Sequence, residues 1–304
     1  MDANPRVSEV ELSNWGEIFL NPDIQRIIEY AYQRNVALSA WNGANFNHVR
    51  ESVLEAMVRY KFRAITCSID GASSGVYELY RRNGDFGRVI DNIRKLNAYK
   101  RRWKSRYPKL WWQMVVFGHN EHEIGAARGL ATELGMGFVL KTNWDDSYSP
   151  LRGERAAMPA GDAPRAEAYS VDRDELLSDG ICHQLWNEPQ INFDGTVLGC
   201  CVNTWGSFGE NAFEVGLERA LGSEKLSYAK EMLSGRASPK AGIPCTTCSS
   251  YLSRARTRRW LPPVPARRGV LAFLRRRGLG RLVVWMDNRF GRFLLPMVRL
   301  LRIS

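Results

Sequence analysis

Residues 110–117, with the sequence LWWQMVVF, form a nearly continuous apolar run of strand length. Such runs are typical of parallel strands whose faces are covered by helices. Four more short strands are predicted around this one, at residues 8–15, 36–41, 62–69 and 136–140. Helical stripes separate the strands, so the sequence predicts an α/β fold, either a parallel sheet or a partial (β/α) barrel.

Turn and capping residues set the expected limits of these elements. The pair Asn42-Gly43 is expected to close the second strand, and Asn47 to open the helix after it. Asn120 and Glu123 have the spacing of a capping box and are expected to start the last helix of the sheet domain. Because ligand sites of parallel α/β folds lie at the carboxyl ends of the strands, candidate residues are sought there.

Composition excludes several classes of protein. The chain has 304 residues, 44% of them apolar, which is enough for a sizeable core and excludes a disordered or collagen-like chain. The first residues lack the basic and apolar pattern of a signal peptide, and no stretch approaches the length of a membrane-spanning helix. Six cysteines are too few for a secreted disulfide scaffold, so a cytoplasmic location is expected.

The positive charge is concentrated in the tail. The formal net charge is +11, but residues 251–304 hold fourteen Arg and one acidic residue, so residues 1–250 are nearly neutral. A nucleic-acid-binding core is therefore not expected. Residues 267–302 interleave Arg with large apolar residues, and their glycines and Pro296 are expected to break them into short helical pieces. Peripheral contact with an anionic membrane and packing back on the sheet domain both remain open for this segment.

Changes in pattern along the chain predict four segments. The sheet domain is expected at residues 1–146, and a linker rich in Pro, Gly and Ala at residues 147–179. A compact cysteine-rich α+β module is expected at residues 180–250, and an Arg-rich amphipathic helical tail at residues 251–304.

The cysteine-rich module carries the strongest chemical signal. Its candidate metal ligands are Cys182, Cys200, Cys245 and Cys248. The turn signal Asp194-Gly195 predicts a hairpin that ends near the second of these cysteines. Four thiolates hold either a tetrahedral zinc ion or a 4Fe-4S cluster, and spacing does not separate the two. Ordinary buried cysteines and a redox CxxC pair are the alternatives, and the role of Cys201 stays open.

Cys67 and the histidines are weaker candidates. Cys67 lies in the middle of the strand AITCSI and is expected in the core rather than at a metal. The four histidines are scattered, and only His183, beside Cys182, is a candidate for contact with a metal ligand.

Taken in order, several motifs resemble those of the radical S-adenosylmethionine (radical SAM) enzymes. Gly16-Glu17 resembles the GGE motif of that family, Asn42-Gly43 its TNG turn, and residues 68–71 (SIDG) and 80–86 (YRRNGDF) the stretches that follow. The cysteine-rich module is similar to the SPASM or Twitch domain, which holds an auxiliary 4Fe-4S cluster. The resemblance covers residues 8–250.

The resemblance implies roles for five residues at the carboxyl ends of strands. Gly16 and Glu17 would bind the methionine amino group of S-adenosylmethionine, Ser68 and Asp70 would lie near its ribose and carboxylate, and Arg81 would pair with that carboxylate. Without the resemblance, each residue has an ordinary explanation as a loop cap, a turn or a solvated charge. No catalytic residue is assigned.

One family motif is missing from the sequence. Radical SAM enzymes carry CxxxCxxC, whose three thiolates hold the 4Fe-4S cluster that cleaves S-adenosylmethionine, and this sequence contains no such triplet. As printed, it is expected to be inactive in radical chemistry. Either the triplet lies upstream, and the protein abstracts hydrogen from a peptide or a sugar- or cyclitol-like substrate, or the chain is a non-catalytic scaffold or interaction protein that binds an iron-sulfur cluster or zinc.

Overall fold

The structure is a computed structural model, and it describes residues 2–143, 147–151, 181–262 and 277–300. The chain divides into two compact units. The first unit comprises Met1–Glu167 and Gly269–Ser304, and the second Ala168–Arg268. Each unit is described by itself.

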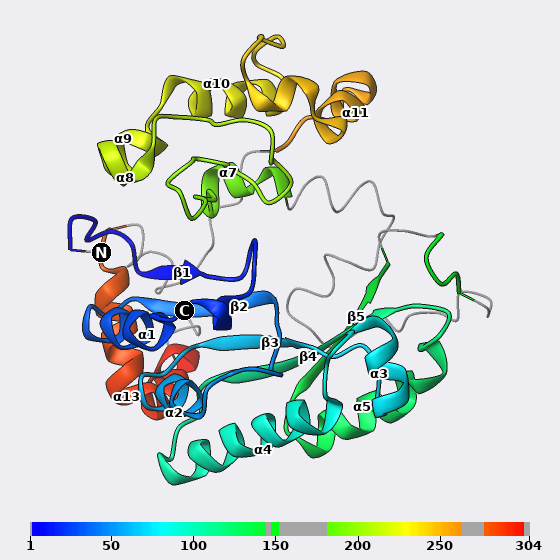
Figure 1. Cartoon of the computed structure of the whole chain (residues 1–304). Helices are drawn as coiled ribbons and strands as arrows, with labels where there is room; N and C mark the ends of the chain where they lie inside the picture. The colour runs from blue at the N-terminus through cyan, green and yellow to red at the C-terminus, as the bar shows by residue number, and fades with distance from the viewer. Residues whose placement is uncertain (1, 144–146, 152–180, 263–276, 301–304) are drawn as a thin grey trace. The chain divides into compact units, whose positions relative to one another are not determined.

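The first unit is built on a parallel sheet of five strands in the order β1-β2-β3-β4-β5 (Figure 1). The strands are β1 Glu9–Glu11, β2 Ala37–Ala44, β3 Ala64–Ser68, β4 Lys109–Val116 and β5 Gly137–Thr142. The connecting helices are η1 Ile18–Leu20, α1 Ile24–Gln33, α2 Glu51–Arg59, α3 Ser74–Tyr80, α4 Phe86–Arg102, η2 Glu121–Glu123 and α5 Ile124–Glu133. Sequential order and parallel pairing confirm the predicted α/β, partial-barrel fold.

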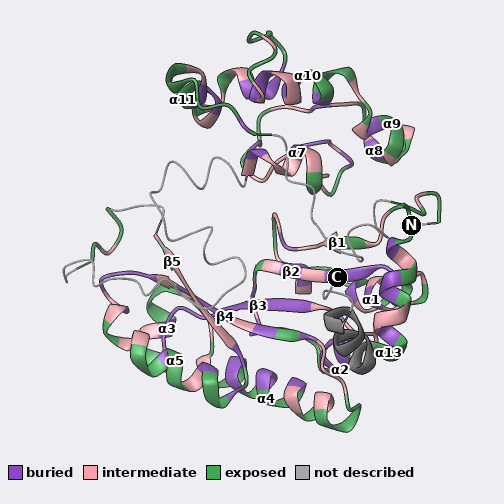
Figure 2. Ribbon diagram, turned by 180° about the vertical axis from the view of Figure 1, so that it is seen from behind, coloured by how far each residue is buried: buried purple, intermediate pink, exposed green. Residues whose placement is uncertain are grey.

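The core of this unit lies between the sheet and its helices. The central strand β3 is buried along its whole length (Figure 2), and Ile65 and Cys67 pack in the core with Leu54 of α2 and Ile93 of α4. Cys67 is therefore a core residue, as predicted. Because side chains alternate along a strand, Thr66 and Ser68 point to the opposite face of the sheet.

One predicted strand end and the bonds of one predicted capping box differ from the structure, because long-range contacts decide them. Strand β2 continues to Ala44 through a register shift, with Gly43 at φ +113°, instead of closing at Asn42-Gly43. A Cβ at Gly43 would lie 2.2 Å from the Ser68 Oγ, so close packing requires glycine there. The Asn120 side chain makes no cap hydrogen bond, and Glu123 instead accepts from the Ala72 N–H and the Ser73 hydroxyl.

The second unit is mainly helical where it is described. Its helices are α7 Gln184–Asn187, α8 Ala212–Val215, α9 Leu217–Leu221, α10 Glu224–Leu233, η4 Pro244–Thr247 and α11 Ser249–Thr257. The predicted hairpin is present: Ile191 bridges Val197, and the Gly195 N–H donates to the Asn192 carbonyl. Helix α11 belongs to this unit, although its residues from 251 onward are predicted in the tail.

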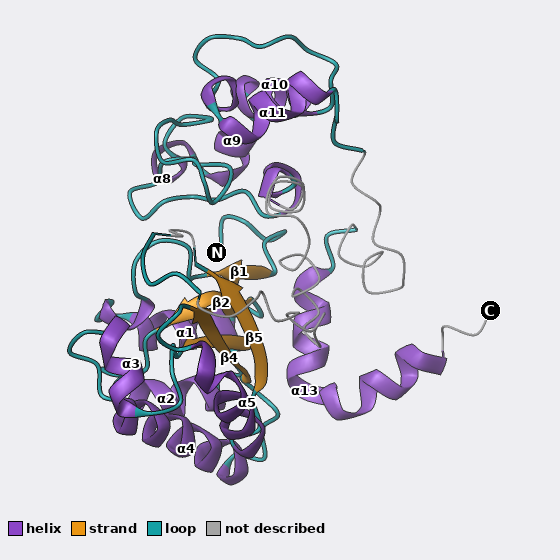
Figure 3. Cartoon of the chain, turned by 90° about the vertical axis from the view of Figure 1, so that its right-hand side faces the viewer, coloured by secondary structure: helices purple, strands orange, loops and turns teal. Residues whose placement is uncertain are grey.

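The described part of the tail is one helix, α13, Gly280–Leu300. It runs through Gly291 and Pro296, so the prediction of short pieces is wrong for this stretch, although the helix is visibly bent (Figure 3). The buried Val283 and Val284 and the ion pair of Asp287 with Arg63 attach it to the first unit. Residues 263–276 lie outside the described residues.

Asp287 also accepts hydrogen bonds from Arg106 and Tyr107. Arg63 immediately precedes β3, and Tyr107 lies two residues before β4, so the helix contacts the amino ends of these strands. Of the two alternatives for the tail, the described part therefore shows packing on the sheet domain. None of the described helices has the length and hydrophobicity needed to cross a membrane.

Candidate ligand and metal sites

Glu17 lies in the loop after β1, and the resemblance to radical SAM enzymes implies that it binds the methionine amino group. Its carboxylate accepts hydrogen bonds from the Asn45 N–H (2.7 Å) and the Phe19 N–H (3.2 Å). Burial raises the pKa of this carboxyl, while the two backbone donors and the charge of Arg81 oppose the rise. The preceding Gly16 has φ +83°, a conformation that favours glycine.

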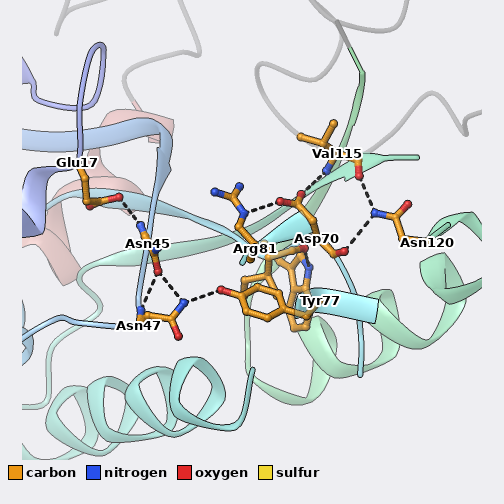
Figure 4. Close-up of polar contacts among 10 residues, drawn as sticks. Glu17, Asn45, Asn47, Asp70, Tyr77, Arg81, Val115 and Asn120 are labelled. Carbon is orange, nitrogen blue, oxygen red and sulfur yellow. Dashed lines mark hydrogen bonds and ion pairs between the residues drawn. The ribbon is translucent and has the colours of Figure 1, made fainter. Parts of the chain in front are cut away.

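A hydrogen-bond chain fixes the loop that holds Glu17 (Figure 4). Asn45 accepts from the backbone and side-chain nitrogens of Asn47, both at 2.9 Å, and the Asn47 amide donates to the Tyr77 hydroxyl at 2.8 Å. Asn47 also accepts from the Asp85 N–H at the start of α4. The position of the Glu17 carboxylate therefore depends on α3 and α4 as well as on β2.

Asp70 and Arg81 form a pair just beyond the carboxyl end of β3. The Asp70 carboxylate is fully buried, and it accepts from the Arg81 Nε and from the Val115 N–H, both at 2.7 Å (Figure 4). Its backbone carbonyl accepts from the Asn120 amide. The carboxylate thus holds the guanidinium in place, and Arg81, whose side chain is 26% exposed, is the member of the pair that solvent reaches.

Ser68 lies on the face of the sheet opposite to Ile65 and Cys67. Its neighbour there is Gln113, which the sequence analysis missed. Gln113 of β4 pairs with Ser68 in register, and its side chain is only 5% exposed. Within the described part of the chain, the Gln113 Oε1 is buried without a hydrogen-bond partner. It is therefore an acceptor available to a bound hydroxyl or amine. In the sequence this glutamine is hidden inside an apolar run, and only its odd position among apolar residues could have signalled it.

The predicted cysteine ligands of the second unit come together. Cys182, Cys200, Cys245 and Cys248 all line one largely apolar cavity of about 20 Å³. Cys245 lies in η4, and Cys248 is the N-cap of α11. Cys201 is not among the residues that line the cavity, and its N–H donates to the Gln184 side chain instead. Of the adjacent pair, Cys200 is thus the candidate ligand.

Burial raises the pKa of the Cys182, Cys200 and Cys245 thiols. It raises the pKa of Cys182 to about 12, with the nearby Arg254 lowering it and Cys200 and Cys248 raising it further. The pKa of Cys245 is raised by burial and by the other three cysteines. Such thiols ionise when a metal binds and replaces their protons.

The donor set fits a metal, but the cavity is small. Across residues 2–143, 147–151, 181–262 and 277–300, no group of three or more His, Cys, Asp or Glu side chains stands ready as a metal site. A space of about 20 Å³ admits about one water molecule or a single ion, so a larger cluster requires the four thiols to move apart.

His183 is the histidine that the sequence analysis named as a candidate for contact with a metal ligand. Its ring packs against Trp186.

Arg254 is a second residue that the sequence analysis missed in this region. Its side chain is buried, its Nη1 donates to the Arg259 carbonyl at 3.1 Å, and its charge lowers the pKa of Cys182. In the sequence it is one of many arginines after residue 250, and its burial follows only from the place of α11 in the second unit.

Comparisons with known proteins give a structural likeness only. No family model matches the sequence, and no curated protein does. Solved structures of SuiB from Streptococcus suis match with TM-scores of 0.54–0.56. The chain shares the fold of SuiB. One SuiB structure contains S-adenosylmethionine and another the precursor peptide SuiA.

The SuiB likeness has limits. Sequence identity is 13% for the S-adenosylmethionine complex, 12% for SuiB alone and 14% for the SuiA complex. The matches cover 80%, 84% and 80% of this chain but 60%, 66% and 59% of the SuiB chains. This chain therefore spans about three fifths to two thirds of the length of the proteins that it matches.

Proposed function

We propose that this chain is a radical SAM/SPASM-type protein. Its first unit binds S-adenosylmethionine, and its second unit holds an auxiliary 4Fe-4S cluster through Cys182, Cys200, Cys245 and Cys248. One observation carries the proposal: four cysteines line a single cavity in a chain that shares the fold of SuiB, a protein solved with S-adenosylmethionine.

The residues of the first unit suit the charged methionine end of S-adenosylmethionine. The Glu17 carboxylate accepts from the ammonium group, and Arg81, held by Asp70, donates to the carboxylate. Ser68 and Gln113 offer a hydroxyl and an amide oxygen to the ribose hydroxyls. The backbone hydrogen bonds to Glu17 and the ion pair of Asp70 with Arg81 position these groups before the ligand arrives.

In the second unit, the chemistry of the donors suits a metal centre. Four thiolates are the ligand set of 4Fe-4S clusters and of structural zinc. A bound iron-sulfur cluster supplies a one-electron acceptor or donor. The apolar lining of the cavity, with Leu185, Phe208 and Tyr251, excludes water from the sulfur atoms.

The residues of this chain do not fit the cluster that cleaves S-adenosylmethionine. The sequence contains no CxxxCxxC, and Cys67 is fully buried in the core. No radical step is therefore derived from these residues. A peptide is the proposed substrate class, because a matching SuiB structure contains the precursor peptide SuiA.

A second candidate function is a non-catalytic metal-binding scaffold. The small cavity volume of about 20 Å³ favours it, since a single zinc ion needs less space than a cubane cluster. This candidate predicts a colourless protein that contains zinc and no affinity of the first unit for S-adenosylmethionine.

Binding of S-adenosylmethionine to the full chain, measured by equilibrium dialysis, tests the proposal. Arg81→Gln and Glu17→Gln are expected to weaken binding about tenfold or more, because each loses a hydrogen bond to a charged group worth about 1.5–3 kcal/mol. The control is Arg82→Gln, because Arg82 is exposed on the same segment and should leave affinity unchanged. Absence of binding by the unmodified chain, or equal losses in all three variants, contradicts the proposal.

A further inference from the structure

The loop from Leu198 to Gly206 carries the candidate ligand Cys200, and several of its residues line the cavity. Its first turn is set by Gly199, which has φ +73°. The Cys200 N–H donates to the Leu198 carbonyl at 2.9 Å across this glycine. A Cβ at Gly199 would lie 2.6 Å from the ring of Phe208, so the backbone conformation and the packing both require glycine. These contacts fix the backbone immediately before Cys200.

Asn203 holds the rest of this loop, and it is only 2% exposed. Its amide nitrogen donates to the carbonyls of Leu198 (2.8 Å) and Gly206 (2.7 Å). Its amide oxygen accepts from the N–H groups of Trp205 (3.3 Å) and Gly206 (3.2 Å). A side-chain amide has two N–H donors and an oxygen with two lone pairs. The loop therefore uses the whole hydrogen-bonding capacity of this buried side chain.

Two further hydrogen bonds connect the loop to the other segments that carry candidate ligands. The Cys201 N–H donates to the Gln184 side chain at 2.8 Å, and Gln184 lies two residues after the first candidate cysteine. The Trp205 Nε1 donates to the Pro244 carbonyl at 3.1 Å, immediately before Cys245. The loop therefore sets the position of its own cysteine relative to both of these segments.

We propose that Asn203 is a positioning residue of the four-cysteine site, which holds Cys200 at the cavity so that it binds a metal together with the other three cysteines. This inference rests on the metal site of the proposed function. Because its polar atoms all bond within the loop, Asn203 supplies no ligand atom itself. A ligand loop that is ordered beforehand loses less conformational entropy when the metal binds, so the effect of Asn203 is on metal affinity.

The first test titrates the anaerobic, metal-free full chain with Co²⁺, whose thiolate absorption reports binding by cysteines. Asn203→Asp keeps the size of the side chain but sets a carboxylate oxygen against two backbone carbonyls. It should bind Co²⁺ about tenfold more weakly, and its thiolate absorption at saturation should fall because Cys200 no longer reaches the metal. The matched control is Asn211→Asp, which should bind as the unmodified chain does. Asn211 also donates its amide to a carbonyl of the second unit, that of Asp194, but it does not line the cavity.

The second test needs no metal and measures the rate at which iodoacetamide alkylates Cys200 in the metal-free full chain, located by mass spectrometry. The rate should be several-fold higher in Asn203→Asp than in Asn211→Asp, because the loop no longer holds Cys200 at the cavity. Alkylation of Cys67, in the core of the first unit, should stay as slow as in the unmodified chain, which excludes general unfolding as the cause. Asn203→Ser breaks hydrogen bonds of the same loop without adding a charge, and it takes the place of Asn203→Asp if that variant does not fold.

Equal Co²⁺ affinities, or equal rates of Cys200 alkylation, in the variants at positions 203 and 211 overturn the role of Asn203. Failure of the unmodified chain to bind Co²⁺ through its cysteines overturns the proposed metal site instead. The alkylation rates then show separately whether Asn203 holds Cys200, so the two claims are distinguished.

Discussion

Glu17 and Asp70 are two carboxylates of the first unit that differ in burial and in the groups that donate hydrogen bonds to them. Asp70 is fully buried and accepts hydrogen bonds from Arg81 and the Val115 N–H, so its charge is balanced within the protein. Glu17 is half-buried and is held mainly by backbone donors. Burial raises the pKa of the Glu17 carboxyl, and the backbone donors and the charge of Arg81 oppose the rise.

The raised pKa of Glu17 predicts a pH dependence of stability. The folded chain keeps the Glu17 proton to a higher pH than the unfolded chain, whose carboxyl titrates near 4.5. The free energy of unfolding should therefore lose a contribution as pH rises from about 4.5 through the folded pKa. Urea unfolding of Glu17→Gln should lack this contribution, and identical pH profiles for the variant and the unmodified chain would refute the assignment.

Asp70→Asn tests the buried pair directly. The variant loses the charge that holds Arg81 and weakens the hydrogen bond from the Val115 N–H, so the free energy of unfolding should fall by about 1–3 kcal/mol. Asp91→Asn, which alters an exposed pair with Arg94, should change it by less than about 0.5 kcal/mol. Comparable losses in both variants would show that burial does not set the contribution of Asp70 to the free energy of unfolding.

At the residue level, sequence reasoning selected candidate residues only where a motif marked them. The four cysteines were selected by their spacing, and all four line one cavity. Gln113 and Arg254 were missed, because their burial depends on the fold around β4 and α11. A lone polar residue in an apolar strand and one arginine among many carry no periodic signal.

Among the elements, local patterns predicted the sheet and its helices, while distant contacts set their ends. Apolar runs and helical stripes are local properties, so all five strands appear near their predicted places. The extension of β2 depends on the fit of Gly43 against Ser68 of the next strand. Asn120 has the sequence of a cap but bonds to the Asp70 carbonyl, fifty residues away.

Helix α13 is the element that differs most from its prediction, because one helix replaces the short pieces expected there. Asp287 joins it to Arg63, Arg106 and Tyr107 at the amino ends of β3 and β4. Asp287→Ala should lower the free energy of unfolding of the first unit by about 1–3 kcal/mol and speed proteolysis of the tail. Asp23→Ala removes only an exposed pair with Arg26 and serves as the control. An equal proteolysis rate in both variants would argue against attachment through Asp287.

At the scale of the whole molecule, the chain consists of two units with separate cores. The four candidate metal ligands all lie in the second unit, whereas the candidate S-adenosylmethionine residues lie in the first. A metal that binds only the second unit should therefore stabilise that unit alone.

Thermal unfolding of the full chain should accordingly show two transitions, only one of which responds to metal. Zinc at about 100 times its dissociation constant should stabilise that transition by about 2.7 kcal/mol. Cys248→Ser should abolish the shift, and Cys201→Ser should leave it intact. A shift of both transitions, or a shift that survives Cys248→Ser, would speak against a metal site confined to the second unit.

The central claim is that the second unit binds an iron-sulfur cluster through four cysteines, and the content of iron and acid-labile sulfide after anaerobic reconstitution of the full chain tests it most directly. The account predicts about four iron and four sulfide per chain, a loss of both in Cys245→Ser, and retention in Cys201→Ser. Equal iron in Cys245→Ser and the unmodified chain, or zinc without sulfide, would contradict it.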